Sequence, residues 1–283
     1  MRLLFAALLF ICISTTQSHA QDNDTRLYRL DCGDIHVSNL NVFSDTDAYI
    51  GKTKDLTVSC YLIKHGKKWI MWDTGIASAI ADMPDGITNG PFTATLKDTI
   101  PQQLEKLGLS PDDITHVGIS HMHFDHSANT NLFKNATLII QKTELDFLDE
   151  HTEKAAALNM SKDNIAHFLS DTESNNIMLL DGDTDIFGDG VLKAISLPGH
   201  TAGHMALMLT LPKAGKVILS GDQWHFRENH KRNGVPSFNI DRADTLASSD
   251  KLNKVLRNNR AKLIIQHEPK DNVRLPLLPA YLK

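Results

Sequence analysis

Four of six consecutive residues in this chain have side chains that commonly bind divalent metal ions. Residues 121–126 have the sequence His-Met-His-Phe-Asp-His and directly follow an apolar run. Neutral imidazoles and carboxylates are the ligands that zinc and similar ions prefer. On a turn after a strand, His121 and His123 can face one cation, while Asp125 and His126 face a second. The alternative is a surface loop that is rich in histidine by chance.

Three later residues complete the predicted ligand set, and each of them also follows an apolar run. They are His200, Asp222 and His267. We assign His200 to the first cation and His267 to the second. Asp222 can bridge both cations through its two carboxylate oxygens, whereas a lone aspartate here would be interpreted as a turn residue that caps backbone N–H groups. The sequence therefore predicts two adjacent metal sites that share a carboxylate, each with an open position for water or substrate.

The four apolar runs predict buried strands, because short aliphatic or β-branched runs closed by Gly or polar residues are typical of strands. They lie at 114–120, 191–197, 217–220 and 261–266. Functional residues are commonly found on the loops that follow such strands. Strands that are neighbours in one core would therefore bring the predicted ligands together.

Helices are expected between the strands, at 101–107, 143–158 and 241–256. The first begins with a proline and stops before a glycine. The last has Asp241 as its N-cap. Its candidate inward residues are Leu246, Leu252 and Leu256. Strands mixed with helices along the whole chain predict an α/β fold of sheets covered by helices.

The ligand pattern resembles the metallo-β-lactamase superfamily in residue identity, order and spacing. His-x-His-x-Asp-His is followed by Gly-His-Thr-x-Gly-His at 199–204, by Gly-Asp at 221–222 and by a last histidine; the match extends from Leu27 to Leu282. The resemblance implies an αβ/βα sandwich, two mixed β-sheets flanked by helices, with the metals along one edge. It also implies that Asp73, in Trp-Asp-Thr-Gly at 72–75, supports the ligands without binding metal. We expect a supporting role for His204 as well.

Within the superfamily, the chain is similar to the N-acyl homoserine lactonases. The similarity lies in residues 120–126, in Ile-Ile-Gln-Lys-Thr-Glu at 139–144 and in Phe-Asn-Ile-Asp at 238–241. It implies a dinuclear hydrolase that opens the lactone ring of N-acyl homoserine lactones by attack of a hydroxide bridging two divalent ions. Asp125 or Asp222 would handle the proton. Zinc is the expected metal, although iron, cobalt and manganese take the same ligands.

Two positions depart from the lactonase pattern. Those enzymes often carry a tyrosine three residues after the bridging aspartate, where this chain has His225. His225 is either a catalytic donor to the developing oxyanion or a surface histidine. A glycine pair after the metal motif is replaced by Ala128-Asn129. Phe124, inside the motif, is either a residue of the acyl pocket or an ordinary core aromatic.

Two alternative functions stay open from the sequence. The same centre could hydrolyse another lactone, an aryl ester, an organophosphate or a β-lactam, or the protein could be a non-catalytic, exported zinc-binding protein. A net charge of −5 without clustered basic residues predicts no nucleic-acid partner. The expected partner is a small-molecule lactone or ester, without stable membrane insertion. The sequence also permits a homodimer.

The first twenty residues have the pattern of a secretory signal peptide. Arg2 precedes an apolar run at 3–13, and Ser-His-Ala at 18–20 places small residues at both key cleavage positions. A membrane anchor is the alternative, but the run is too short to span ~30 Å of hydrocarbon. We therefore expect a signal peptide at 1–20, a hydrolase domain at 21–283 and a periplasmic or secreted location.

Cys32 and Cys60 would remain in the exported chain. An oxidising compartment permits a disulfide between them. Two buried free thiols are the alternative, because each cysteine lies in or beside an apolar run.

Overall fold

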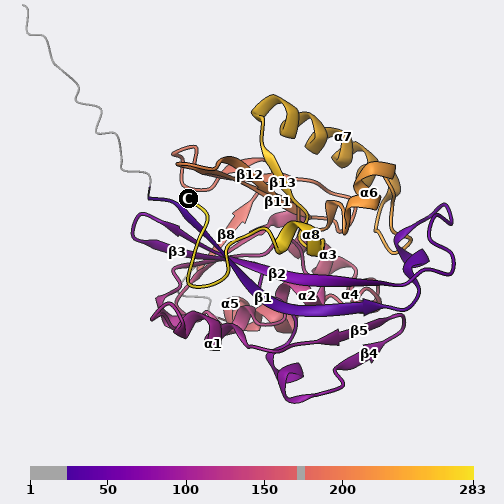
Figure 1. The fold of residues 1–283 in the computed structure, drawn as a ribbon, viewed down its shortest axis with the longest axis horizontal. Helices are drawn as coiled ribbons and strands as arrows, with labels where there is room; N and C mark the ends of the chain where they lie inside the picture. The colour runs from indigo at the N-terminus through magenta and orange to yellow at the C-terminus, as the bar shows by residue number, and fades with distance from the viewer. Residues whose placement is uncertain (1–23, 171–175) are drawn as a thin grey trace, which may run out of the picture.

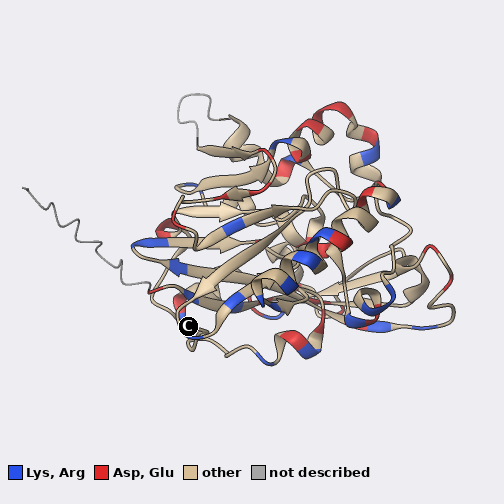
Figure 2. Cartoon of the chain, turned by 90° about the horizontal axis from the view of Figure 1, so that it is seen from above, with Lys and Arg blue, Asp and Glu red and all other residues tan. Residues whose placement is uncertain are grey.

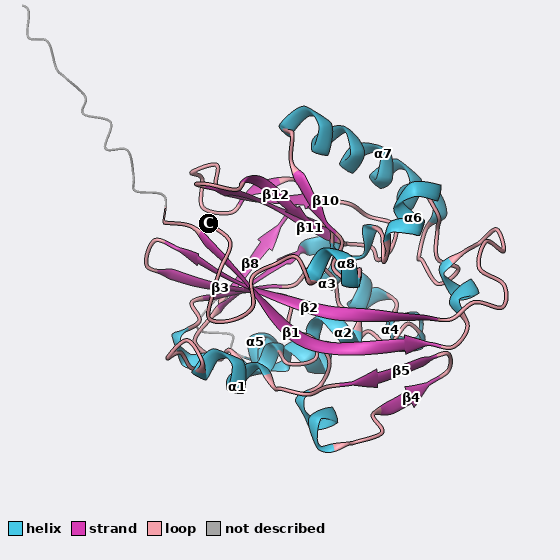
Figure 3. Ribbon diagram, viewed as in Figure 1, coloured by secondary structure: helices cyan, strands magenta, loops and turns pink. Residues whose placement is uncertain are grey.

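The computed structural model describes residues 24–170 and 176–283. The predicted signal peptide at 1–20 lies outside these residues. The described chain forms two β-sheets packed face to face, with helices over the outer face of each sheet (Figures 1 and 3). This arrangement confirms the predicted αβ/βα sandwich.

The larger sheet is mixed, and its described strands follow the order β4-β5-β1-β2-β3-β6-β7-β8. They are β1 (Arg26–Val37), β2 (Lys54–His65), β3 (Lys68–Trp72), β4 (Ile87–Asn89), β5 (Phe92–Thr95), β6 (His116–Gly118), β7 (Thr137–Gln141) and β8 (Ile177–Leu180). The pairs from β4 to β3 are antiparallel, and those from β3 to β8 are parallel. Successive residues of β2 alternate between two cores, because Leu62 packs against the helical layer and Ile63 against the second sheet.

The smaller sheet has the order β13-β12-β11-β10-β9. Its strands are β9 (Thr184–Asp185), β10 (Leu192–Ser196), β11 (Met205–Leu211), β12 (Gly215–Leu219) and β13 (Lys262–Ile264). β12 and β13 are parallel and the other pairs antiparallel, so this sheet is mixed as well. Trp72 and Leu207 belong to the core between the sheets, while Ile218 and Leu252 pack in a third cluster on the outer face.

The helices cover the two outer faces and connect the strands (Figure 3). The α-helices are α1 (Ile100–Glu105), α2 (Phe124–Ser127), α3 (Lys142–Glu150), α4 (Thr152–Ala157), α5 (Ala166–Ser170), α6 (Arg227–Arg232), α7 (Arg242–Asn259) and α8 (Pro269–Asn272). The short 3-10 helices are η1 (Leu40–Phe43), η2 (Ser78–Asp82), η3 (Pro111–Asp113), η4 (Thr130–Leu132), η5 (Lys162–Ile165) and η6 (Gly221–Gln223). No helix in the described ranges is both long and apolar enough to cross a membrane. Acidic and basic residues lie together on exposed elements such as α7 (Figure 2).

The helix predicted at 143–158 is wrong as a single element. The chain leaves the helical conformation at His151, with φ −130° and ψ 48°, so that α3 ends and α4 begins there. The turn allows Leu148 on α3 and Ala155 on α4 both to be buried in the core. Packing of two apolar faces therefore overrides the continuous helical pattern of the sequence.

The helix predicted at 241–256 is confirmed as α7, and the Asp241 carboxylate accepts a hydrogen bond from the Asp244 N–H. Of its three candidate inward leucines, only Leu252 is fully buried. The first turns of α7 instead bury small polar residues, namely Thr245, Ser248 and Ser249. They are buried because their partners belong to the loops that carry the predicted ligands.

Cys32 on β1 and Cys60 on β2 form a disulfide, with their Cα atoms 5.8 Å apart. The strands are already paired at this point, since Leu30 lies opposite Cys60. The structure thus decides between the two alternatives that the sequence left open.

Candidate metal centre

The seven predicted ligands meet at one edge of the sandwich. The loop at 121–126 follows β6 of the larger sheet, whereas the other three ligands follow β10, β12 and β13 of the smaller sheet. All seven residues are 7% exposed or less. They form two clusters of candidate metal ligands, which are His121, His123, His200 and Asp222, and Asp125, His126 and His267.

Three imidazoles form the first cluster, which we call site 1. Nε2 of His121 lies 3.0 Å from Nδ1 of His123, and Nε2 of His200 lies 3.1 and 3.0 Å from the same two atoms. Ligand atoms bound to one tetrahedral zinc ion would lie about 3.3 Å apart. The three nitrogens therefore surround a space of the size that one cation requires.

Site 2 consists of Asp125, His126 and His267. The Nε2 atoms of the two histidines are 3.1 Å apart, and Oδ2 of Asp125 lies 3.5 Å from Nε2 of His267. Asp222 stands between the sites. Its Oδ1 lies 3.0 Å from Nε2 of His267 in site 2, and its Oδ2 lies 3.4 Å from Nε2 of His200 in site 1. One carboxylate thus presents one oxygen to each site.

The hydrogen bonds behind the ligands indicate which ring nitrogens carry protons. Nδ1 of His200 donates to Oδ1 of Asn239, and Nδ1 of His267 donates to the carbonyl oxygen of Thr57. Nδ1 of His126 donates to Oδ2 of Asp73. Because these acceptors require a proton on Nδ1, the Nε2 lone pairs of all three rings face the centre of the clusters.

This arrangement fits divalent metal ions. The Nε2 lone pairs of His126 and His267 face each other at 3.1 Å, which is repulsive unless a positive charge lies between them. Oδ1 of Asp222 is buried and has no hydrogen-bond partner among the described residues. The donor set of imidazoles and carboxylates is the one that zinc takes. The residues present therefore fit two divalent ions.

The pKa values of the histidines differ between the two sites. Burial lowers the pKa of His123 to about 4, and burial likewise holds the pKa values of His121 and His200 well below normal. Burial also disfavours charge on His126 and His267, but the nearby carboxylates of Asp222 and Asp125 outweigh it and raise both pKa values. Positive charge is therefore disfavoured on the imidazoles of site 1 and favoured on those of site 2, where a cation would compete with protons for the Nε2 atoms.

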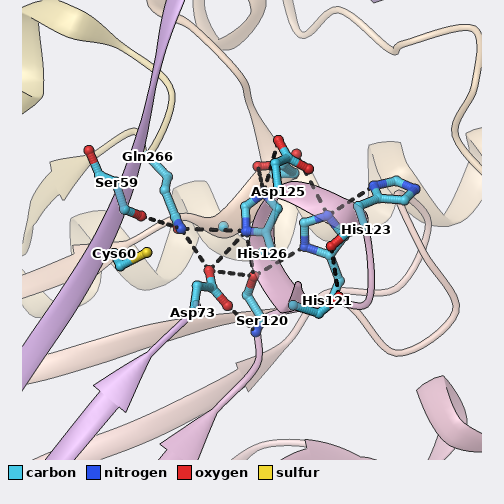
Figure 4. A network of polar contacts seen from close by, with 12 residues as sticks. Ser59, Cys60, Asp73, Ser120, His121, His123, Asp125, His126 and Gln266 are labelled. Atoms are coloured by element: carbon cyan, nitrogen blue, oxygen red, sulfur yellow. Dashed lines mark hydrogen bonds and ion pairs between the residues drawn. The ribbon is translucent and has the colours of Figure 1, made fainter. Parts of the chain in front are cut away.

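Asp73 supports site 2 as the resemblance implied (Figure 4). Its carboxylate accepts from Nδ1 of His126 at 2.9 Å, from the Ser120 N–H at 2.7 Å and from the Ser120 hydroxyl at 2.8 Å. A fourth donor is Nε2 of Gln266, at 2.7 Å, which also donates to the carbonyl oxygen of Ser59. Asp73 has a φ of 58°, so the backbone is held in a left-handed conformation to aim this carboxylate.

His204 is a supporting residue in the structure. Its Nδ1 donates to the carbonyl oxygen of Leu197, and its Nε2 accepts a hydrogen bond from the Asp222 N–H at 2.8 Å. Both ring nitrogens are therefore occupied. The residue orients the bridging aspartate through its backbone.

A pocket with a volume of about 270 Å³ opens directly above the two sites. His123, Asp125, Asp222 and His267 belong to its lining. Apolar side chains form most of the remaining wall, among them Ile35, Phe43, Leu56, Phe92, Phe124 and Phe238. Phe124 thus lies in the pocket and not only in the core. The shape suits a small molecule with a polar end at the ligands and an apolar remainder.

His225 also lines the pocket and is not a surface residue, since it is 4% exposed. Its Nε2 lies 3.0 Å from Oδ2 of Asp222. The ring stacks on His267 at an interplanar angle of 9° and meets the edge of Phe43. The imidazole is therefore held rigidly at the boundary between site 1, site 2 and the pocket.

The replacement of the glycine pair has a structural explanation at Asn129. Its Nδ2 donates to the carbonyl oxygens of Thr74 and Ile76 at 2.7 Å each, and its Oδ1 accepts from the Ser78 N–H at 3.0 Å. The side chain thereby holds the loop that follows Asp73. The departure leaves the two sites intact.

Three supporting residues were not recognised from the sequence as parts of the centre. They are Glu144, Asn239 and Gln266. Glu144 and Asn239 lie in segments that resemble the lactonases, and Gln266 directly precedes a ligand. Their positions in the sequence could therefore have indicated a role in the metal centre, whereas their residue types alone could not. Their role becomes visible only through contacts with residues far away in the chain.

The sequence profile of the metallo-β-lactamase superfamily matches residues 53–267, so the chain belongs to this superfamily of hydrolases. It is 28% identical over 256 residues to the N-acyl homoserine lactonase AttM of Azorhizobium caulinodans. This alignment covers 87% of this chain and 94% of AttM. An N-acyl homoserine lactone hydrolase, solved with its product N-hexanoyl-L-homoserine at the catalytic metal centre, superposes with a TM-score of 0.76 at 23% identity, covering 91% and 98% of the two chains. AidC, a dizinc quorum-quenching lactonase, superposes with a TM-score of 0.64 at 21% identity, covering 87% and 88%. The two structures show the shared fold.

Proposed function

We propose that this protein is a dinuclear, zinc-dependent hydrolase that opens the lactone ring of N-acyl homoserine lactones. The observation that carries the proposal is Asp222, whose two oxygens face two separate ligand clusters at the floor of an apolar pocket. The lactonase AttM supports the substrate class, since the similarity extends over most of both chains. AidC, named as a dizinc enzyme, supports the choice of zinc.

Two bound divalent cations would supply a nucleophile at neutral pH and polarise the ester carbonyl. The contribution of the protein is to hold the ligands in place before substrate arrives. Asp222 sets the spacing of the two sites, because each of its oxygens faces one of them. Asp125 belongs both to site 2 and to the pocket lining, so it is placed to accept a proton from the attacking water; Asp222 is the other candidate.

His225 would stabilise charge on the substrate carbonyl. Its Nε2 lies beside Oδ2 of Asp222 at the pocket floor, and its Nδ1 has no hydrogen-bond partner among the described residues, so one ring nitrogen is left for the carbonyl oxygen of a bound ester. A donor fixed at that point stabilises the transition state more than the ground state. Stacking on His267 fixes the ring in this orientation.

The pocket favours an uncharged substrate that has an apolar chain. None of the described residues that line it is a Lys or Arg, and its charged residues include Asp125 and Asp222. The carboxylate of a β-lactam antibiotic would therefore find no lysine or arginine partner in the described wall of the pocket. An N-acyl homoserine lactone carries no charge, and its acyl chain can bury apolar surface against the phenylalanines of the wall.

The proposal is tested with a substrate panel. The zinc-loaded protein is given a long-chain N-acyl homoserine lactone, a chromogenic cephalosporin and an aryl ester, and acid release is followed. We expect the lactone to be turned over fastest. Asp222→Asn should lower this rate by more than the roughly 100-fold that loss of an outer-shell partner costs. Asp181→Asn, at an exposed site, is the control and should match the wild type.

Other outcomes of the substrate panel would favour a different function. If the cephalosporin or the aryl ester is turned over faster than the lactone, the protein is still a hydrolase, but the proposed substrate class is wrong. Two tightly bound zinc ions without turnover of any substrate would favour the zinc-binding protein. Failure of the purified protein to bind zinc would remove the metal centre and the proposal with it.

We also propose that residues 1–20 are a signal peptide and that the mature protein is periplasmic or secreted. The disulfide between Cys32 and Cys60 supports export, because disulfides persist in oxidising compartments. The periplasmic fraction should then contain a protein whose first residue is Gln21. A full-length protein beginning at Met1 would contradict this.

A further inference from the structure

Glu144 is a buried carboxylate that belongs to neither metal site. It lies in the first turn of α3 and is 0% exposed. Its Oε1 accepts a hydrogen bond from the Met122 N–H at 2.8 Å, and its Oε2 accepts one from the Gly203 N–H at 2.7 Å. One side chain thus connects two loops that are about eighty residues apart in the sequence.

The two loops are those that carry the three imidazoles of site 1. Met122 lies between His121 and His123, and Gly203 lies three residues after His200. Nε2 of His200 must meet the other two rings at 3.0 to 3.1 Å. The carboxylate of Glu144 therefore joins the backbones whose separation determines this meeting point.

The second glycine of the Gly-His-Thr-x-Gly-His motif is explained by the same contact. A Cβ atom on Gly203 would lie 2.4 Å from the backbone nitrogen of Glu144 and 2.6 Å from its Cβ. No side chain can fit between them, so the loop packs directly on the first turn of α3. This close packing brings the Gly203 N–H within reach of the carboxylate.

A carboxylate is a costly residue to bury for stability alone. The two backbone N–H groups that it binds are uncharged, whereas a buried charge is usually paired with an opposite charge. Glutamine has nearly the same shape but only one acceptor oxygen, so it can serve only one of the two N–H groups. The two equivalent oxygens of glutamate are what the connection requires.

We propose that Glu144 is a positioning residue for site 1, which sets the distance between His200 and the pair His121 and His123 and thereby the affinity of site 1 for its cation. The proposal rests on the metal centre of the proposed function, not on its substrate. It predicts that a change at Glu144 weakens site 1 and leaves site 2 unaffected.

The test isolates each site before changing Glu144. His267→Ala removes a ligand of site 2, so that zinc binding to this variant reports site 1. His200→Ala removes a ligand of site 1, so that binding reports site 2. E144Q is added to each variant, and zinc affinity is measured by competition with a chromogenic chelator. E150Q, at the exposed end of α3, is the matched control for loss of the charge.

We expect E144Q to lower the zinc affinity of the His267→Ala protein by about 10- to 100-fold, as outer-shell partners of metal ligands do. The His200→Ala protein should keep its affinity, and E150Q should change neither. In the cobalt-loaded proteins, the visible absorption bands should shift only where site 1 is occupied, which a general loss of stability would not produce.

Equal zinc affinities of the His267→Ala protein with and without E144Q would overturn the proposal, as would an equal loss at both sites. If E144Q does not fold, E144D is used, since it keeps the charge but is one methylene too short to reach both loops; an unchanged site 1 affinity would again overturn the proposal. A wild-type protein without bound zinc would instead contradict the proposed function.

Discussion

The two metal sites share Asp222 but are held in place by different parts of the molecule. In site 1 the imidazole of His200 donates to the uncharged amide of Asn239, and the Glu144 carboxylate accepts hydrogen bonds from the backbone of the ligand loops. Site 2 is supported by the Asp73 carboxylate, which accepts four hydrogen bonds, one of them from Gln266, which also donates to Ser59 next to Cys60 (Figure 4). A carboxylate behind a histidine makes it a more basic ligand than an amide does.

The supports also differ in how far they extend from the centre. In site 1, the chain of hydrogen bonds that begins at His200 is short. Asn239 donates to the Thr245 hydroxyl, and this hydroxyl donates to the carbonyl oxygen of Asp241, so the chain ends within the first turn of α7. Behind site 2, Gln266 connects Asp73 to Ser59 on β2, and the next residue forms the disulfide. Perturbations should therefore be separable, and each should affect one site before the other.

The largest expected effect concerns the disulfide. Replacing both Cys32 and Cys60 by Ser should lower the free energy of unfolding by about 3–4 kcal/mol, because the bond closes a loop with a sequence separation of 28 residues. The loss should loosen site 2 first, since a Cβ on Gly75, in the turn after Asp73, would lie only 2.5 Å from Cβ of Cys32. Denaturant unfolding measures the stability, and chelator competition measures each site. An unchanged unfolding free energy would show that the disulfide has no stabilising role.

Asp73→Asn should weaken zinc binding at site 2 by about 100-fold, or roughly 2.7 kcal/mol. Asparagine tolerates the left-handed backbone of this position, so the loss would come from the missing charge behind His126. Asn239→Ala is the matched variant at site 1 and should cost about 10-fold there. Chelator competition in the single-site backgrounds measures both. Equal weakening of both sites by either variant would contradict the separation of the two supports.

The smallest expected effect is that of His225→Phe, which keeps a ring against His267 but removes the donor. Turnover should fall by about 10-fold, equivalent to roughly 1.4 kcal/mol of transition-state stabilisation, while two metals remain bound. The measurement is kcat together with metal content. The same replacement at exposed His151 serves as the control. Unchanged kinetics in His225→Phe would remove this residue from the mechanism.

The types and order of the predicted ligands were determined by the sequence alone, and so was the class of fold. Strand-like runs that end on His or Asp are local patterns, and the period of a strand or helix is readable from a short window. The seven residues at 121, 123, 125, 126, 200, 222 and 267 were named in this way, and the structure brings all of them together. Local patterns also identified the N-cap at Asp241.

Only the tertiary structure decided which residues support the ligands. Asn239, Gln266 and Glu144 have ordinary types in their own segments, and each acts on a ligand loop that the fold brings beside it. The pairing of Cys32 with Cys60 and the break between α3 and α4 at His151 were decided in the same way. Such features depend on packing and hydrogen bonds between distant segments, and the free energy of those contacts exists only when both partners are in place.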